Sequence, residues 1–118
     1  MIRNKTGRIV NITSLSGLKG NPGMSAYSAS KAAIVAFSKS LSKELKGTGI
    51  IINCLAPGFI QTDMTQDLSE EYYTQRMLNS ISGRMGTVKE AAEMVLFLAK
   101  DAPDYFINQE VILDGGIS

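Results

Sequence analysis

Three residues in the first third of the chain have the types and spacing of a proton-transfer site: Ser14, Tyr27 and Lys31. On a helix, positions i and i+4 share one face, so Lys31 would stand beside Tyr27. An ammonium ion next to a phenol favours the phenolate, so a tyrosine in this setting can exchange a proton near neutral pH. A serine brought in from a strand end can hydrogen-bond the same substrate oxygen. The spacing predicts a site that interconverts a carbonyl and an alcohol.

The apolar pattern predicts the elements that position these residues. A β-branched run at residues 8–13 predicts a strand buried on both faces, and a glycine-rich loop follows it. Residues 25–46 have apolar side chains every three to five positions, which predicts a helix with one buried stripe. The members of that stripe are Ala29, Ile34, Phe37, Leu41 and Leu45.

The rest of the chain alternates further strands with helices. Residues 50–55 predict a second strand, and residues 63–84 predict short helices over a mobile loop. Residues 87–100 predict a helix that begins with a Thr87–Glu90 capping box and buries Ala91, Met94, Val95 and Leu98. Residues 106–113 predict a third strand. This order favours an α/β fold with an open parallel sheet, whose ligands bind beyond the carboxyl ends of the strands.

Composition narrows the class of protein and the chemistry. The 118 residues are 44% hydrophobic and 19% charged with net charge +1, which gives no reason to expect nucleic acid or an anionic membrane as partner. We find no leader or membrane-spanning pattern and expect a cytoplasmic chain. The absence of histidine excludes a Ser-His-Asp mechanism and imidazole-based metal sites, and we expect no metal. The single Cys54 predicts a buried thiol on a strand.

Two segments carry a resemblance to a known family. The run from Gly7 to Ser14, continued by Tyr27-Ser28-Ala29-Ser30-Lys31, resembles the strand, serine and Tyr-x-x-x-Lys helix of the short-chain dehydrogenase/reductase family. The run from Asn53 to Thr62 is similar to the family's second landmark. The resemblance implies that Tyr27 is the general acid, that Ser14 orients the carbonyl oxygen, and that Lys31 also holds the nicotinamide ribose.

The resemblance further implies a nicotinamide cofactor, NADP or NAD. The cofactor-binding residues that it implies are Tyr27, Lys31, Pro57, Gly58, Ile60 and Thr62, with the Thr62 hydroxyl at the carboxamide. A catalytic domain of this family is about twice as long as this chain, and residues 1–118 resemble its second half. The expected fold is therefore the C-terminal half of a Rossmann-like doubly wound parallel sheet. The glycine-rich dinucleotide half would be absent, leaving only the nicotinamide end of the cofactor site.

Within the family, the sequence is most similar to reductases of 3-oxoacyl groups carried on acyl carrier protein in fatty acid synthesis. That similarity implies a 3-oxoacyl substrate, small or bound to the carrier, with residues 63–83 as its lid. Arg76 and Arg84 are candidates for contacting an acidic carrier, and ordinary solvation explains them equally well. Partners of the chain would be further copies of itself or a missing amino-terminal half. The alternative hypothesis is a non-enzymatic remnant or interaction fragment without cofactor-binding capacity, and we expect the isolated chain to be inactive.

Overall fold

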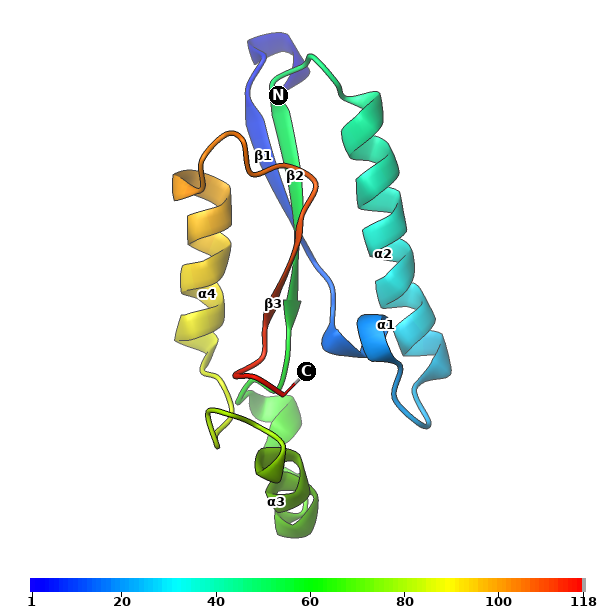
Figure 1. Cartoon of the computed structure of the whole chain (residues 1–118), viewed down its shortest axis with the longest axis vertical. Coiled ribbons are helices and arrows are strands. Elements are labelled where there is room, and N and C mark those ends of the chain that lie inside the picture. Colours follow the sequence, from blue (N-terminus) through cyan, green and yellow to red (C-terminus); the bar gives the residue numbers. More distant parts are fainter. Residues whose placement is uncertain (118) are drawn as a thin grey trace.

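The computed structural model describes residues 1–117, which form a three-stranded parallel sheet with helices on both sides (Figure 1). The strands β1 (Gly7–Ile12), β2 (Ile50–Pro57) and β3 (Glu110–Leu113) lie side by side in that order. Helix α2 (Ser25–Glu44) lies on one side of the sheet and α4 (Val88–Leu96) on the other. The predicted α/β class with three parallel strands and flanking helices is confirmed.

The core of the described residues is centred on β2. This strand has a neighbour on each edge and lies between α2 and α4, and its residues Ile52 and Leu55 are almost fully buried. The prediction that residues 8–13 are buried on both faces was wrong for residues 8–12, whereas Thr13 is buried. β1 pairs only with β2 among residues 1–117, its residues are half-buried, and Ile12 is 44% exposed. An edge position leaves the outer flank of a β-branched strand uncovered.

The buried face of α2 differs from the predicted apolar stripe. Ala29 lies on the exposed side and Phe37 is 61% exposed, so these two members of the stripe were predicted wrongly. The face toward the sheet carries polar groups instead. Ser38 is buried, accepts a hydrogen bond from Asn11 Nδ2 at 2.7 Å and donates one to the Ile34 carbonyl at 2.7 Å. Because the Ser38 hydroxyl both accepts and donates a hydrogen bond, it can be covered without the cost of lost hydration. Ser28 Oγ of the same helix is buried without a partner within residues 1–117.

A short helix, α1 (Leu15–Lys19), occupies part of the region expected to be a glycine-rich loop. Ser14 caps its amino end, with the side-chain oxygen accepting from the backbone N–H of Ser16 at 3.2 Å. Gly17 lies against α2 so closely that a Cβ there would stand 3.0 Å from Lys31 Cβ. The missing side chain of Gly17 therefore lets α1 pack onto the helix that carries Tyr27 and Lys31.

The segment after β2 contains the predicted short helices. They are a single 3-10 turn, η2 (Asp63–Thr65), and α3 (Glu70–Leu78), which lies beyond the carboxyl ends of the strands (Figure 1). The capping box of Thr87 and Glu90 at the start of α4 is confirmed, as is the inward-facing stripe of that helix. After Leu96, α4 passes into a π-helical turn, η3 (Phe97–Asp101).

The third strand begins four residues later than predicted. Asn108 has a positive φ of 61°, a left-handed conformation that interrupts an extended chain. The side chain of Asn53 fills the gap beside β2: its Nδ2 donates to the Phe106 carbonyl and its Oδ1 accepts from Gln109 N–H, both at 2.9 Å. Residues 106–109 are thus held to β2 by two bonds of this side chain and by two backbone bonds. The backbone bonds run from Asn108 N–H to the Ile52 carbonyl at 2.9 Å and from Cys54 N–H to the Gln109 carbonyl at 2.8 Å.

The described chain is elongated, with extents of 51 × 28 × 23 Å. Its radius of gyration is 15.8 Å, whereas a compact domain of this length has a value of about 13.5 Å. Large apolar side chains accordingly remain on the surface, among them Phe37 and Leu78. No helix within residues 1–117 is both long and apolar enough to cross a membrane.

Candidate active site

The carboxyl ends of the three strands form one edge of the sheet, and the predicted site residues gather there. Thr13 fixes the end of β1 to β2, since both its backbone N–H and its hydroxyl donate to the Leu55 carbonyl, at 2.8 and 3.1 Å. The end of β2 is fixed to β3 by a bond of 2.8 Å from Gly58 N–H to the Leu113 carbonyl. Ser14 and Gly58 therefore leave the sheet at the same edge.

Tyr27 and Lys31 occupy adjacent turns of α2 next to this edge. Lys31 Nζ lies 5.7 Å from the centroid of the Tyr27 ring and donates a hydrogen bond to the Ile12 carbonyl at 3.4 Å. An ammonium group has three N–H donors, so two remain for a ligand. The Tyr27 side chain is accessible, and its hydroxyl makes no hydrogen bond with any residue of the described range 1–117. The phenol is free to meet a substrate oxygen.

Ser14 reaches the same groove from the start of α1. Its oxygen accepts the capping bond from Ser16, which holds the side chain in one orientation. A serine hydroxyl still has one O–H to donate, and that donor has no acceptor among residues 1–117. Ser14 can therefore donate to an oxygen bound in the groove.

The loop after β2 forms the opposite wall of the groove. A Cβ on Gly58 would stand 2.6 Å from Asp114 Cβ, so only glycine permits this loop to pass beside the end of β3. Ile60 forms an isolated bridge with Gly86, which anchors the middle of the loop. The backbone N–H of Thr62 donates to Thr65 Oγ1 at 2.9 Å at the entry to η2.

These elements enclose a groove of about 1030 Å³ that all seven predicted site residues line. They are Ser14, Tyr27, Lys31, Pro57, Gly58, Ile60 and Thr62. Their individual roles stay predictions. Sequence reasoning missed the contributions of Asn21, Phe59 and Tyr72, which also line the groove. Nothing in the local sequence marks Asn21 or Tyr72, because only the chain path after α1 and along α3 brings them to the groove. Phe59 stands between Gly58 and Ile60, so its place in the predicted loop could have indicated it.

The structure separates the two candidate arginines. The two terminal guanidinium nitrogens of Arg84, Nη2 and Nη1, donate to the Glu90 carboxylate at 2.6 and 2.9 Å, so the charge of Arg84 is compensated within the protein. The same contact, together with a bond from the Thr87 backbone, lowers the pKa of Glu90 to about 2. Arg76 instead lines the groove and has no ion-pair partner within residues 1–117.

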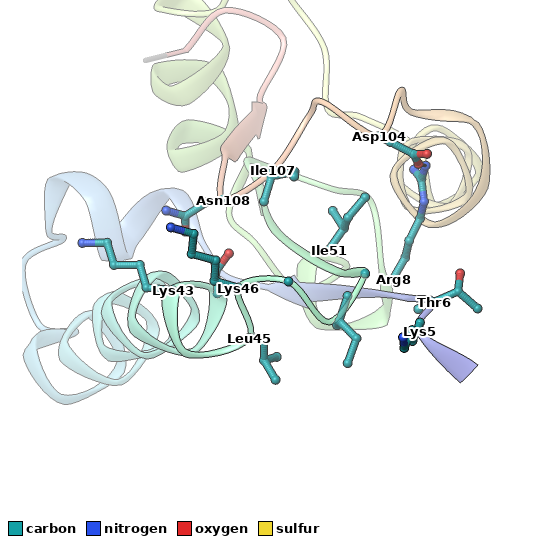
Figure 2. A pocket seen from close by; sticks show the side chains of 15 residues that line it. Lys5, Thr6, Arg8, Lys43, Leu45, Lys46, Ile51, Asp104, Ile107 and Asn108 are labelled. Atoms are coloured by element: carbon teal, nitrogen blue, oxygen red, sulfur yellow. Dashed lines mark hydrogen bonds and ion pairs between the residues drawn. The ribbon is translucent and has the colours of Figure 1, made fainter. Parts of the chain in front are cut away.

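A second cavity, of about 630 Å³, lies at the amino ends of β1 and β2 (Figure 2). Figure 2 shows Arg8 reaching Asp104, to which it is paired at 2.6 Å, while Lys43 and Lys46 extend on the other side. None of the predicted site residues lines this cavity. It therefore lies apart from the candidate chemistry, which is confined to the carboxyl edge.

Comparison with known proteins agrees with this geometry. Residues 1–118 match a family model described as enoyl-(acyl carrier protein) reductase. The chain is 44% identical over 118 residues to the 3-oxoacyl-[acyl-carrier-protein] reductase of Chlamydia trachomatis, and 44% identical over 117 residues to that of Haemophilus influenzae. The crystal structure of a 3-oxoacyl-[acyl-carrier protein] reductase from Brucella melitensis superimposes with a TM-score of 0.93 at 31% identity.

These matches cover nearly all of this chain but only part of the relatives. The chain spans 48% of each of the two curated reductases, and the superposition covers 99% of this chain and 44% of the Brucella chain. Sheet, helices and groove define a doubly wound α/β protein of the type that binds ligands beyond its strand ends. The chain belongs to the short-chain dehydrogenase/reductase family and corresponds to the C-terminal region of its members.

Proposed function

We propose that this chain is the catalytic half of a nicotinamide-dependent reductase that converts 3-oxoacyl thioesters into 3-hydroxyacyl thioesters. The observation that carries the proposal is the convergence of Ser14, Tyr27 and Lys31 on one groove. Each of the first two presents a hydroxyl that has no acceptor within residues 1–117. Two hydroxyl donors beside a fixed ammonium group form a suitable environment for a carbonyl oxygen that gains negative charge.

In the proposed reaction, Tyr27 donates its phenolic proton to the substrate oxygen as the carbonyl carbon is reduced. Ser14 donates a hydrogen bond to the same oxygen and fixes its position, because its own orientation is set by the capping bond to Ser16. The positive charge of Lys31 offsets the negative charge that develops on the Tyr27 oxygen as its proton leaves. The tether to the Ile12 carbonyl holds that ammonium near the ring.

The residues present fit the nicotinamide end of the cofactor, which supplies the hydride when bound. Lys31 has two N–H donors left for the ribose hydroxyls. The loop with Pro57, Gly58, Ile60 and Thr62 lines the same groove, and at Gly58 it passes close to Asp114. We assign the nicotinamide ribose to Lys31 and the carboxamide to Thr62. Contacts to the pyrophosphate and adenosine would come from outside this chain.

The choice of substrate follows the relatives' names, which refer to 3-oxoacyl groups on acyl carrier protein. The description of the family model refers instead to enoyl groups, so the two thioester classes must be compared directly. A 3-oxoacyl thioester offers a ketone oxygen for Tyr27 and Ser14 to bind. An enoyl thioester has no oxygen at that carbon, so we expect the groove to favour the ketone.

One observation favours the alternative of an interaction fragment without activity. The described chain is elongated and leaves large apolar side chains such as Phe37 exposed, which is typical of a surface that another polypeptide covers. An interaction fragment would bind such a partner without any turnover. The two hypotheses therefore differ in a single measurable property, the activity of the assembled complex.

The test combines this chain with the amino-terminal part of the Chlamydia trachomatis reductase that the chain does not match. NADPH oxidation is followed with acetoacetyl and crotonyl thioesters, for the chain alone and for the mixture. We expect no turnover by the chain alone, and turnover of the acetoacetyl thioester by the mixture. A complex that forms but oxidises no NADPH would contradict the proposed function and support the interaction fragment. Faster turnover of the crotonyl thioester would overturn the substrate assignment.

A further inference from the structure

Arg76 of α3 places its guanidinium group against two neighbouring aromatic rings at the groove. Its Cζ atom lies 5.5 Å from the centroid of the Phe59 ring and 5.2 Å from that of the Tyr72 ring. The two rings are themselves 6.0 Å apart and inclined at 47°. Aromatic faces attract a cation at such distances and limit its rotation. Since Phe59 belongs to the loop after β2, the arginine links α3 to the proposed cofactor-binding wall.

The hydrogen bonds of Arg76 leave part of the guanidinium group available. Nη2 donates to Asn21 Oδ1 at 3.2 Å and to Tyr72 Oη at 3.0 Å. A guanidinium group has five N–H donors, and those on Nη1 and Nε donate to no atom of residues 1–117. No carboxylate in this range lies within 4.0 Å to balance the charge. Arg84, in contrast, has both a fork of hydrogen bonds and a counter-charge in Glu90.

We infer that Arg76 binds an anionic oxygen group of the substrate, a carboxylate or a phosphodiester, and thereby determines which thioesters this chain accepts. The inference rests on the proposed function. A planar guanidinium fork matches the geometry of both anions and binds either with two parallel hydrogen bonds. Arg76 is half-buried in a groove with aromatic walls, where a charge pair is stronger than in open water. The carboxylate would belong to the acyl chain and the phosphodiester to the pantetheine arm.

Arg76 also makes a structural hydrogen bond, whose effect must be distinguished from binding of the substrate anion. Its bond to Asn21 ties α3 to the segment between α1 and α2, so loss of the side chain also breaks that tie. Asn21→Ala removes the tie and keeps the charge, whereas Arg76→Gln removes the charge. Arg84→Gln serves as the matched control, because it removes one positive charge that lies outside this groove.

The experiment measures binding of three probes to the purified full chain by NMR titration at low ionic strength. The probes are acetoacetyl pantetheine, which is neutral, its 4′-phosphate, and the pantetheine monothioester of a 3-oxo dicarboxylic acid. We expect one anionic probe to bind about ten-fold more tightly than the neutral probe, the effect of one charge-assisted hydrogen-bond pair. Which anionic probe gains affinity identifies the source of the anion. Arg76→Gln should abolish the preference, and Asn21→Ala and Arg84→Gln should retain it.

The possible outcomes distinguish this inference from the proposed function. Equal affinities of the wild-type chain for all three probes would overturn the role of Arg76 and leave the substrate groove intact. Loss of the preference in Asn21→Ala or in Arg84→Gln would also overturn it, because the effect would then be structural or a general effect of net charge. Binding of no probe would remove the proposed substrate site together with the inference. Arg76→Lys keeps the charge without the fork and should retain part of the preference.

Discussion

The ammonium nitrogen of Lys31 lies 5.7 Å from the centroid of the Tyr27 ring, one helical turn away on α2. A bond of 3.4 Å to the Ile12 carbonyl holds this nitrogen at the end of β1, so sheet and helix together set the geometry of the pair. Packing of α1 against α2 at Gly17 places Ser14 at the same groove. Helix–helix and helix–sheet contacts therefore determine the site.

Gly17→Ala should destabilise the fold. The new Cβ would stand 3.0 Å from both Lys31 Cβ and the Ala32 backbone nitrogen. These atoms are part of α2 or directly attached to its backbone, so they cannot move aside as the end of a flexible side chain can. Overpacking of this kind costs about 1–3 kcal/mol in free energy of unfolding. Urea denaturation followed by circular dichroism measures the change. An unchanged midpoint would mean that α1 does not pack on α2 as described.

Acid stability should depend on Glu90. The bonds from Arg84 and from the Thr87 backbone lower the pKa of this carboxyl from 4.5 to about 2 in the folded chain. A lowered folded pKa stabilises the fold above the unfolded pKa, and the benefit is lost as the pH falls through the folded value. Glu90→Gln should therefore lower the urea midpoint near neutral pH, with the difference from wild type shrinking between about pH 4.5 and about pH 2. A difference that does not vary with pH would contradict the assigned pairing.

The thiol of Cys54 should report on folding of the isolated chain. Cys54 lies in the centre of β2, and burial raises its pKa above the ordinary value of 9.0. Thiolate is the reactive form, so a folded chain should react with Ellman's reagent far more slowly than the chain in urea. Because the folded pKa is raised, the contribution of this thiol to stability is full below about pH 9 and falls as the pH rises further. Equal labelling rates with and without urea would show that β2 is not buried in the isolated chain.

Sequence patterns predicted the elements better than they predicted which faces are buried. The stripe that runs from α4 into η3 was predicted correctly: Met94 is half-buried and Leu98 is buried. The stripe of α2 was wrong at Ala29 and Phe37, while its other three members are half-buried. Ser38 and Lys31 face the sheet through hydrogen bonds to Asn11 and Ile12, which apolar periodicity does not detect. The hydrogen bonds from the Asn53 side chain to residues 106–109 likewise cannot be predicted from sequence periodicity.

The candidate site was predicted more fully than the packing around it. The Tyr-x-x-x-Lys spacing and the Pro57-Gly58 loop are local features, and the structure brings them to one groove. The helical conformation of residues 15–19 was missed because glycines at 17 and 20 indicate a loop, although Gly17 is needed for close helix packing. Phe59 and Asn21 form the environment of Arg76, and both are distant from it in sequence. Only the three-dimensional structure therefore distinguishes the environment of Arg76 from that of Arg84.

The most direct test of the central claim is Tyr27→Phe in the complex with the amino-terminal part of the Chlamydia trachomatis reductase. The change removes only the phenolic hydroxyl. Tyr105→Phe is the matched control, because Tyr105 is 98% exposed and does not line the groove. With acetoacetyl thioester and NADPH, we predict that Tyr27→Phe lowers kcat by on the order of 100-fold or more, as loss of a general acid does, and that Tyr105→Phe leaves it unchanged. A Tyr27→Phe complex that turns over at the wild-type rate would contradict the assignment of Tyr27 as the proton donor.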